Sequence, residues 1–245
     1  MKLSVAVISK SSDLEDIFLD RLSFADEILI ITDQPISVTR GENKYKYFHR
    51  PLNGDFASQR NYAIEKASSD WIFFVDSDEV VSSQLADEII SKIGETKYSG
   101  FYLRRLDTIF NQLILHGETG NTRIIRLAKK KSGKFSRSVH EHWEIKGGIG
   151  ELINPLFHKK DHFISEFLDR ISLYGPIDAI NLRNEGKPFN FFRLLAYPKA
   201  KFVQNYFFRK GFLDGYCGLF GAYLMSVQSL SVRVFQWTSK KLSSL

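Results

Sequence analysis

The carboxylates that follow Val75 are the side chains of this sequence best suited to chemistry. The stretch Trp71 to Glu79 reads Trp-Ile-Phe-Phe-Val-Asp-Ser-Asp-Glu, so Asp76, Asp78 and Glu79 come directly after five apolar residues. Aromatic and β-branched residues in a run of this length predict a strand buried on both faces of a parallel sheet. Sheets of this kind bind ligands at the carboxyl ends of their strands, and carboxylates suit Mg²⁺ or Mn²⁺. We therefore expect a divalent metal site here, with a solvated acidic turn as the alternative.

The neighbouring segments predict the elements that position these acids. Ser82 or Ser83 can cap a following helix, whose apolar residues recur at helical spacing. Earlier in the chain, strands at Leu3–Ile8 and Glu27–Asp33 flank a helix at Asp13–Arg21. Two successive βα units predict a Rossmann-like parallel sheet, in which the ends of the first two strands hold a nucleotide. The polar residues at those ends are Ser9, Thr32 and Asp33.

The middle of the chain continues the alternation of strands and helices. A third strand is expected at Lys44–His49, and Asp55 is a plausible N-cap for a helix from Phe56 to Ala67. Strands are also expected at Ser99–Leu106 and Arg123–Leu127, the second of them half-buried. Residues 111–120 are expected to form a loop, 147–155 a loop or short ribbon, and 163–171 the start of an amphipathic helix.

The last 58 residues differ from the rest in charge and in aromatic content. The 245-residue chain is 43% hydrophobic with a net charge of +6, but from Pro188 onward it has eight basic residues, one acid and fourteen aromatic residues. This pattern predicts contact with an anionic surface, and membrane-interface helices suit it best. The uncharged run Gly215–Val232 is marginal for a membrane span, so in-plane association is expected. An aromatic hairpin packed on the preceding domain is the alternative.

The compartment can be inferred from two further features. Cys217 is the single cysteine, which excludes an internal disulfide and fits a reducing compartment. The apolar run after Lys2 is too short for a secretory signal. A cytoplasmic location is therefore expected.

An ordered set of motifs resembles the family 2 glycosyltransferases. The set comprises Asp76-Ser77-Asp78 after its strand, the preceding segment Asp55–Ala63, and the following Val139-His140-Glu141. Within the family the chain looks most like the lipopolysaccharide core β-1,4-glucosyltransferase branch, to which Asn154–His158 and Phe207–Gly215 are also similar.

The resemblance implies a GT-A fold, an α/β architecture with a mostly parallel, Rossmann-like sheet flanked by helices. Residues 1–160 would form the catalytic domain, with nucleotide binding in 1–98 and the acceptor part in 99–160. Residues 161–245 would form a helical, aromatic and basic extension that lies on the membrane surface.

The resemblance also implies roles for individual residues. Asp78 would bind Mg²⁺ or Mn²⁺ bridging the donor phosphates, and Asp76 would contact the ribose or reach the metal through water, with Ser77 between them. Arg60 would lie near the nucleotide. Glu141 is the expected base for the acceptor hydroxyl, since a carboxylate suits that proton transfer.

Four of these assignments keep alternatives. His140 is the competing base, and it could instead bind metal or diphosphate or be a structural histidine. Arg126, with Arg123, could pair with anionic groups of donor or acceptor or lie on a solvated strand face. Glu79 could orient Asp78 or begin the next loop. The family usually has an aspartate where Thr32 stands, so Asp33 takes that contact after a one-residue shift or base recognition differs.

The implied function is a metal-dependent, inverting glycosyltransferase at the cytoplasmic face of the inner or plasma membrane. The donor would be a UDP-hexose such as UDP-glucose, and the acceptor a lipid-linked or cell-envelope saccharide. No nucleic-acid partner is expected.

Two other functions fit parts of the sequence. Asp76-Ser77-Asp78-Glu79 resembles the nucleophile loop of HAD-type phosphatases, in which Asp76 would be phosphorylated. However, that loop should follow an early strand, and later acids are poorly matched. The basic, aromatic C-terminal segment would also suit a nucleic-acid-binding protein, which would leave the buried acidic motif unexplained.

Overall fold

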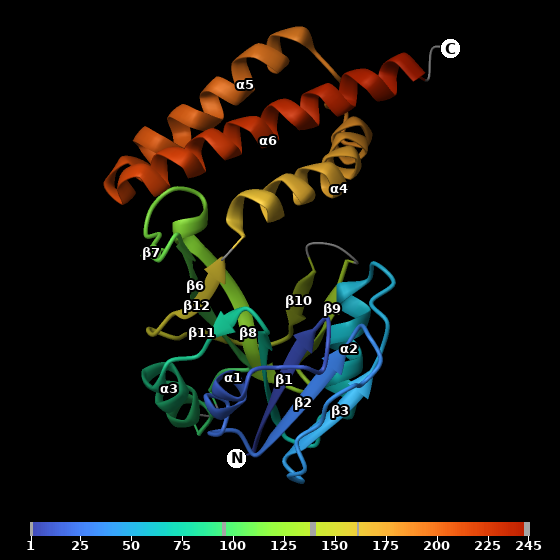
Figure 1. Ribbon diagram of the computed structural model, residues 1–245, viewed down its shortest axis with the longest axis vertical. Coiled ribbons are helices and arrows are strands. Elements are labelled where there is room, and N and C mark those ends of the chain that lie inside the picture. Colours follow the sequence, from blue (N-terminus) through green and yellow to red (C-terminus); the bar gives the residue numbers. More distant parts are fainter. Residues whose placement is uncertain (1, 95–96, 138–140, 161, 243–245) are drawn as a thin grey trace. The chain divides into compact units, whose positions relative to one another are not determined.

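The computed structural model describes residues 2–94, 97–137, 141–160 and 162–242. The chain divides into two compact units (Figure 1). The first contains Met1–Arg105 and Arg123–His158, and the second contains Leu106–Thr122 and Lys159–Leu245. Residues 106–122, which the sequence analysis places in the catalytic part, therefore group with the C-terminal residues.

A mixed, mostly parallel sheet forms the centre of the first unit. Its parallel part has the order β3-β2-β1-β4. Beyond β4 the sheet continues with β8, β6 (Gly100–Ile109), β12 (Leu156–Lys160) and β5 (Glu79–Val80). The four parallel strands are β1 (Leu3–Ser9), β2 (Glu27–Thr32), β3 (Tyr45–His49) and β4 (Trp71–Asp76). The predicted strands and the α/β class are confirmed. However, β4 has a parallel neighbour on one side only, because β8 (Thr122–Lys129) runs antiparallel to it.

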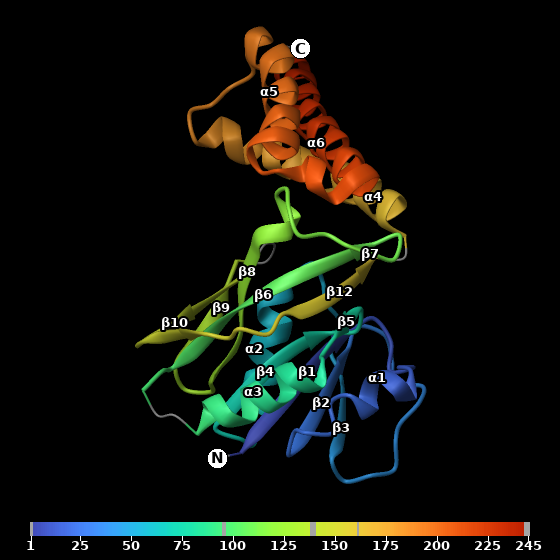
Figure 2. The same cartoon turned by 90° about the vertical axis from the view of Figure 1, so that its left-hand side faces the viewer.

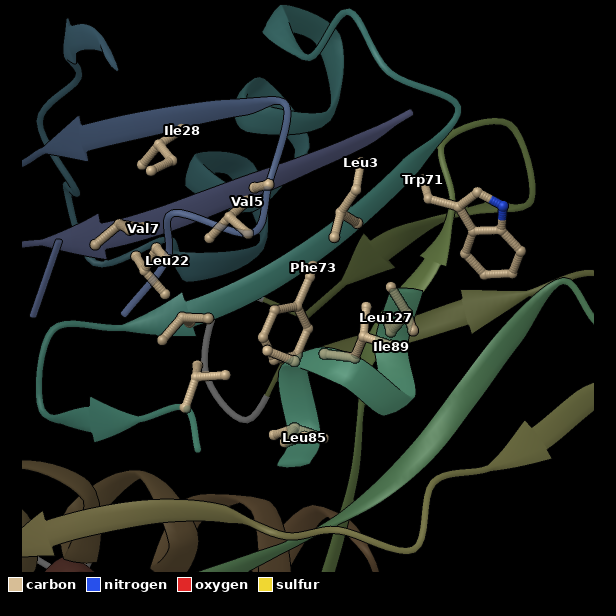
Figure 3. Packing of buried hydrophobic residues seen from close by; sticks show 14 of the residues in the cluster. Leu3, Val5, Val7, Leu22, Ile28, Trp71, Phe73, Leu85, Ile89 and Leu127 are labelled. Atoms are coloured by element: carbon tan, nitrogen blue, oxygen red, sulfur yellow. The ribbon is translucent and has the colours of Figure 1, made fainter. Parts of the chain in front are cut away.

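Both faces of β4 are buried, as its composition predicts. Trp71, Phe73 and Val75 point into one hydrophobic cluster (Figure 3), whereas Ile72 and Phe74 point into the other. Helix α3 (Ser83–Ile93) covers the first cluster and α2 (Phe56–Lys66) the second. Strand β4 is thereby fixed from both sides, so the acids at its end have a rigid support.

Helix capping follows the sequence closely at two of the first three helices. The Asp55 carboxylate accepts a hydrogen bond from the Ser58 backbone N–H at 3.0 Å, and Ser82 Oγ accepts one from Leu85 at 3.2 Å. Helix α1 is shorter than predicted, at Asp16–Asp20. Ser12 Oγ accepts hydrogen bonds from the backbone of residues 37 and 38, and these bonds tie the irregular segment before α1 to that part of the chain.

The remaining strands of the first unit bring distant segments to the sheet. A two-stranded ribbon joins β9 (Gly133–Ser136) to β10 (His142–Ile145), and β11 (Ile149–Glu151) pairs with β6 (Gly100–Ile109). Besides β9 and β10, two further strands of this unit were not predicted: β5 (Glu79–Val80) and β12 (Leu156–Lys160). They pair antiparallel and set His158 opposite Glu79.

The second unit consists mainly of helices. These are α4 (Phe163–Asn184), α5 (Phe191–Val203), a π-helical turn (Gln204–Phe208), a 3-10 turn (Gly211–Asp214) and α6 (Gly215–Leu242). Helices α5 and α6 form an antiparallel hairpin (Figures 1 and 2). Residues 106–122 add β7 (Gln112–Leu113) and a 3-10 turn (Thr119–Asn121) where a loop was expected. Among the residues described, no helix is both long and apolar enough to cross a bilayer.

Buried Asp214 fastens residues 112–116 to the C-terminal helices within this unit. Its carboxylate accepts hydrogen bonds from the backbone N–H groups of Leu115 and His116 and contacts His116 Nδ1 at 2.8 Å. Its backbone carbonyl accepts a bond from Gln112. One aspartate thus satisfies several groups of a chain segment about a hundred residues away.

Glu27, at the start of β2, is a buried carboxylate with three donors. Ser4 Oγ and the Ser68 N–H donate to one oxygen at 2.5 Å each, and Lys46 Nζ lies 2.6 Å from the other. Burial alone would raise the pKa of Glu27, but the Lys46 ion pair and these hydrogen bonds outweigh it and lower the pKa from 4.5 to about 2.

Glu27→Gln is therefore expected to lower the free energy of unfolding by roughly 1–3 kcal/mol near neutral pH. The folded-state pKa is depressed, so the stabilisation is complete above the unfolded pKa of 4.5 and is lost as pH falls toward 2. Urea unfolding of wild type and variant at about pH 7 and about pH 3 should show the difference shrink with acid. The control is Glu65→Gln, at an exposed position of α2. If wild type and Glu27→Gln differed equally in free energy of unfolding at both pH values, this explanation would be contradicted.

Candidate active site

Asp76 is the centre of a charge cluster at the carboxyl end of β4. Arg60 from α2 donates to both carboxylate oxygens through Nη2, at 3.0 and 3.3 Å. Arg126 from β8 donates to Oδ2 at 2.5 Å and also lies 3.3 Å from Glu79 Oε1. The antiparallel pairing of β4 with β8 carries Arg126 to this end of the sheet. Arg126 is 8% exposed, so the interpretation of it as part of a solvated strand face is wrong.

Arg60 connects Asp76 to Glu141. Its Nε donates to Glu141 Oε1 at 2.9 Å, while Nη2 donates to Asp76. The guanidinium lies over the rings of Phe74 and Phe135, with its central carbon 5.4 and 5.6 Å from their centroids. Its third nitrogen, Nη1, is buried and has no hydrogen-bond partner among the residues described. A buried donor of this kind has hydrogen-bonding capacity that the described residues do not meet.

Burial and the two arginines set the protonation of the cluster. Burial would raise the pKa of Asp76, but the charges of Arg126 and Arg60 dominate and hold it well below its ordinary value. Burial likewise raises the pKa of Glu79, and the nearby Asp76 charge adds to that increase. Glu79 Oε2 accepts the Asp76 backbone N–H at 2.9 Å. Glu79 therefore holds the backbone at Asp76 in place. This role differs from the one considered in the sequence, in which Glu79 would orient the Asp78 side chain.

Asp78 faces solvent beside a buried histidine. The Asp78 side chain is 54% exposed, and its Oδ2 lies 3.0 Å from Nε2 of His158, which is 4% exposed. A carboxylate and an imidazole that converge in this way suit a divalent cation. No cluster of three or more histidine, cysteine or acidic side chains able to hold a metal occurs in the part of the chain that the structure describes.

The other predicted nucleotide contacts lie at the ends of β1, β2 and β4. Ser9 and Thr32 are paired in the β1–β2 register, and the Thr32 hydroxyl donates to the Gln34 carbonyl at 2.7 Å. The Asp33 carboxylate accepts the Leu52 backbone N–H at 2.6 Å. Ser77 is exposed next to Asp76. The strand pairing therefore gathers these residues along one edge, although Thr32 and Asp33 already have partners there.

Two remaining predictions concern Arg123 and His140. Arg123 is half-exposed and forms an ion pair with Glu151 at 2.8 Å, apart from the Asp76 cluster. His140 lies outside the described residues, so its proposed roles as base or metal ligand stay predictions.

His158 is the site residue that the sequence analysis missed. It lies in Asn154–His158, a segment noted only for its resemblance to the family. The sequence feature that could have pointed to it is a histidine in a short apolar segment. Its position beside Asp78, however, follows only from the pairing of β12 with β5.

Comparison with known proteins places the chain among glycosyltransferases. The family model described as "Glycosyl transferase family 2" matches residues 5–142. An uncharacterized glycosyltransferase of Rickettsia typhi is 22% identical over 242 residues, covering 89% of this chain and 80% of the relative. The lipopolysaccharide core biosynthesis glycosyltransferase LpsC of Rhizobium meliloti is 24% identical over 180 residues, covering 72% of this chain and 65% of LpsC.

Solved structures resemble the chain less closely. Residues 1–349 of TarS from S. aureus, in complex with UDP-GlcNAc, match with a TM-score of 0.46 and 13% identity, covering 98% of this chain and 92% of that one. The bifunctional IspDF of Campylobacter jejuni matches with a TM-score of 0.37 and 14% identity, covering 54% and 42%.

Proposed function

The chain belongs to glycosyl transferase family 2, and on that premise we propose that it transfers a hexose from a UDP-sugar to a cell-envelope saccharide with inversion. The protein is a glycosyltransferase with a GT-A type of mixed sheet flanked by helices. Family membership sets aside the phosphatase and the nucleic-acid-binding hypotheses. The donor, the metal and the acceptor belong to the proposal.

The observation that carries the proposal is the cluster of Asp76, Arg60 and Glu141. It places an ionised carboxylate, a guanidinium and a second carboxylate within hydrogen-bond distance at the carboxyl end of the parallel strands. This edge is where sheets of this kind bind nucleotides. The buried Nη1 of Arg60 is a hydrogen-bond donor with no acceptor among the residues described. The cluster thus supports a donor site and an acceptor base joined by one arginine.

Asp78 and His158 are the residues that would hold a divalent metal. Asp78 Oδ2 and His158 Nε2 lie 3.0 Å apart, so both atoms could bind one metal ion. The Asp78 carboxylate is exposed and can therefore contact a bound ligand too. When bound, the metal would neutralise the charge that develops on the departing diphosphate. Asp76 is better suited to an indirect role, because both of its oxygens already accept hydrogen bonds from arginine.

Glu141 is the proposed base for the acceptor hydroxyl. Arg60 orients its carboxylate through the 2.9 Å hydrogen bond, and the other carboxylate oxygen remains to accept the proton. A base that activates the acceptor directly gives a single displacement, so an α-linked donor yields a β-glycoside. Arg126 neutralises Asp76 and Glu79 and so keeps the arrangement intact.

The acceptor class is supported by a relative and by the second unit. LpsC is named for lipopolysaccharide core biosynthesis, and this chain matches 65% of its length. The second unit exposes large apolar side chains, which supports association with the cytoplasmic surface of the membrane, where a lipid-linked acceptor would lie. The most exposed of them are Phe191, Phe192, Phe208 and Tyr216.

Calorimetric titration of the purified full chain with UDP tests the donor assignment. We expect binding with Mn²⁺ and loss of that binding with EDTA, while GDP and TDP bind more weakly. Absence of UDP binding under both conditions would refute the proposed donor, and equal binding with EDTA would refute the metal.

A further inference from the structure

A groove of about 610 Å³ lies between the two helices of the α5–α6 hairpin. These helices run side by side in both views of the molecule (Figures 1 and 2). One part of its lining is apolar and the other polar, so the groove can hold an amphiphilic ligand. The apolar side chains are Tyr197, Val203 and Phe208, and the polar ones include Gln204, Ser229 and Arg233.

Arg233 is a cation of this groove that has no ion-pair partner among the described residues. Its Nε is buried and has no hydrogen-bond partner among the residues described. The guanidinium lies over the Tyr197 ring, 4.9 Å from the centroid, and Arg193 approaches the same ring at 6.0 Å. Burial lowers the pKa of Arg233, and the nearby Arg193 charge contributes. A partly buried guanidinium without an anionic partner costs free energy that an anionic ligand would recover.

The other cation of the lining is already paired. Lys201 Nζ lies 2.8 Å from Glu118 Oε2. Arg233 is therefore the group of the groove with charge left to offer a ligand, and the cation–π contact with Tyr197 holds its plane in place.

The apolar walls distinguish a lipid from a small anion. Phe208 is 80% exposed and Val203 40% exposed, so both offer hydrocarbon surface to a bound chain. Inorganic phosphate would leave these walls in water, whereas a neutral acyl chain would leave Arg233 unpaired. A phospholipid with an anionic headgroup satisfies both parts of the groove.

We propose that the groove between α5 and α6 binds one anionic phospholipid, with its phosphate at Arg233 and an acyl chain along Tyr197, Val203 and Phe208. The inference rests on the proposed membrane association and adds a defined lipid site to it. It does not depend on sugar transfer, because the groove contains none of the proposed donor or base residues.

The test is calorimetric titration of the full chain with dihexanoyl phosphatidic acid below its critical micelle concentration. Matched titrations use dihexanoyl phosphatidylcholine and inorganic phosphate. We expect one bound phosphatidic acid per chain. Phosphatidylcholine should bind at least about tenfold more weakly, because its choline cation cancels the headgroup charge beside Arg233, and inorganic phosphate at least about tenfold more weakly, because it has no acyl chain to cover the apolar walls. Phosphatidylcholine or phosphate binding as tightly as phosphatidic acid would overturn the proposal.

Three variants locate the binding. Arg233→Gln should weaken phosphatidic acid binding at least about tenfold, and Ala200→Trp, which fills the groove from α5 while keeping Arg233, should abolish it. Lys199→Gln removes an exposed charge from α5 outside the groove lining and should bind as wild type does. Normal binding by Arg233→Gln or by Ala200→Trp would overturn the proposal. If Arg233→Gln does not fold, Ala200→Trp decides.

Three further readouts separate this site from the proposed function. Asp78→Ala should bind phosphatidic acid normally, and Arg233→Gln should bind UDP normally. Vesicles of phosphatidylcholine with phosphatidylglycerol should still retain part of the Arg233→Gln protein, because the exposed aromatic surface persists. Loss of UDP binding alone would refute the donor assignment and leave the lipid site standing.

Discussion

Glu141→Gln is expected to lower the rate of sugar transfer by about 10²–10⁴-fold, the usual contribution of a positioned base. Glutamine keeps an oxygen that can accept the Arg60 Nε–H, so the local geometry should persist, but it cannot take the acceptor proton. Initial rates of transfer from UDP-glucose to a core oligosaccharide measure the effect. UDP titration in the presence of Mn²⁺ should give an unchanged affinity.

A matched control for this variant is available on β10. Glu144→Gln changes an exposed carboxylate that hydrogen-bonds to Ser136, and it should leave the rate within about twofold, as expected for a surface substitution. Full activity of Glu141→Gln would remove this residue from the role of base. His140 would then be the next candidate to test.

Asp78→Ala is expected to remove metal-dependent donor binding. The affinity for UDP with Mn²⁺ should fall at least about 100-fold, since a metal that bridges phosphates supplies several kcal/mol. The variant with Mn²⁺ should then resemble the wild type with EDTA. Calorimetry gives both affinities, and an Mn²⁺ titration followed by paramagnetic resonance detects the metal without any turnover.

The control for Asp78→Ala is Asp87→Ala, at an exposed position of α3. It removes the same charge at a position outside the Asp76-Ser77-Asp78 motif, so the variant should retain Mn²⁺-dependent UDP binding. His158→Ala should share the loss, because His158 Nε2 faces Asp78 at 3.0 Å. Wild-type affinity in Asp78→Ala would exclude this carboxylate as a metal ligand.

The sequence predicts the centre of the first unit well because each central strand has a local signature. The run Trp71–Val75 is apolar on both sides, and both sides are buried. Asp55 and Ser82 are N-caps, as their types and positions indicate. Helix α1 was overestimated because its apolar spacing extends into residues 13–15. These residues form an irregular segment next to Ser12, whose hydroxyl accepts hydrogen bonds from residues 37 and 38.

The site was only partly predictable because its contacts join segments far apart in the chain. The acids of 76–79 follow a recognisable strand, but the partners of Asp76 come from α2 and β8. The register of the antiparallel neighbour decides which arginine faces inward, and sequence alternation does not reveal that register. His158 depends in the same way on the two-residue strand β5, which is too short to leave a periodic pattern.

The cluster around Asp76 also limits how the sequence can change during evolution. Arg60 and Arg126 are almost completely buried and share one carboxylate, so loss of either arginine leaves a charge unbalanced. Breaking such a buried pair typically costs about 3–5 kcal/mol, a large fraction of the stability of a domain. A substitution of one charged residue in this cluster should therefore be accompanied by substitutions of the residues that it pairs with. Descendants that lose Arg126 should also replace Glu79, and those that lose Arg60 should change both Asp76 and Glu141.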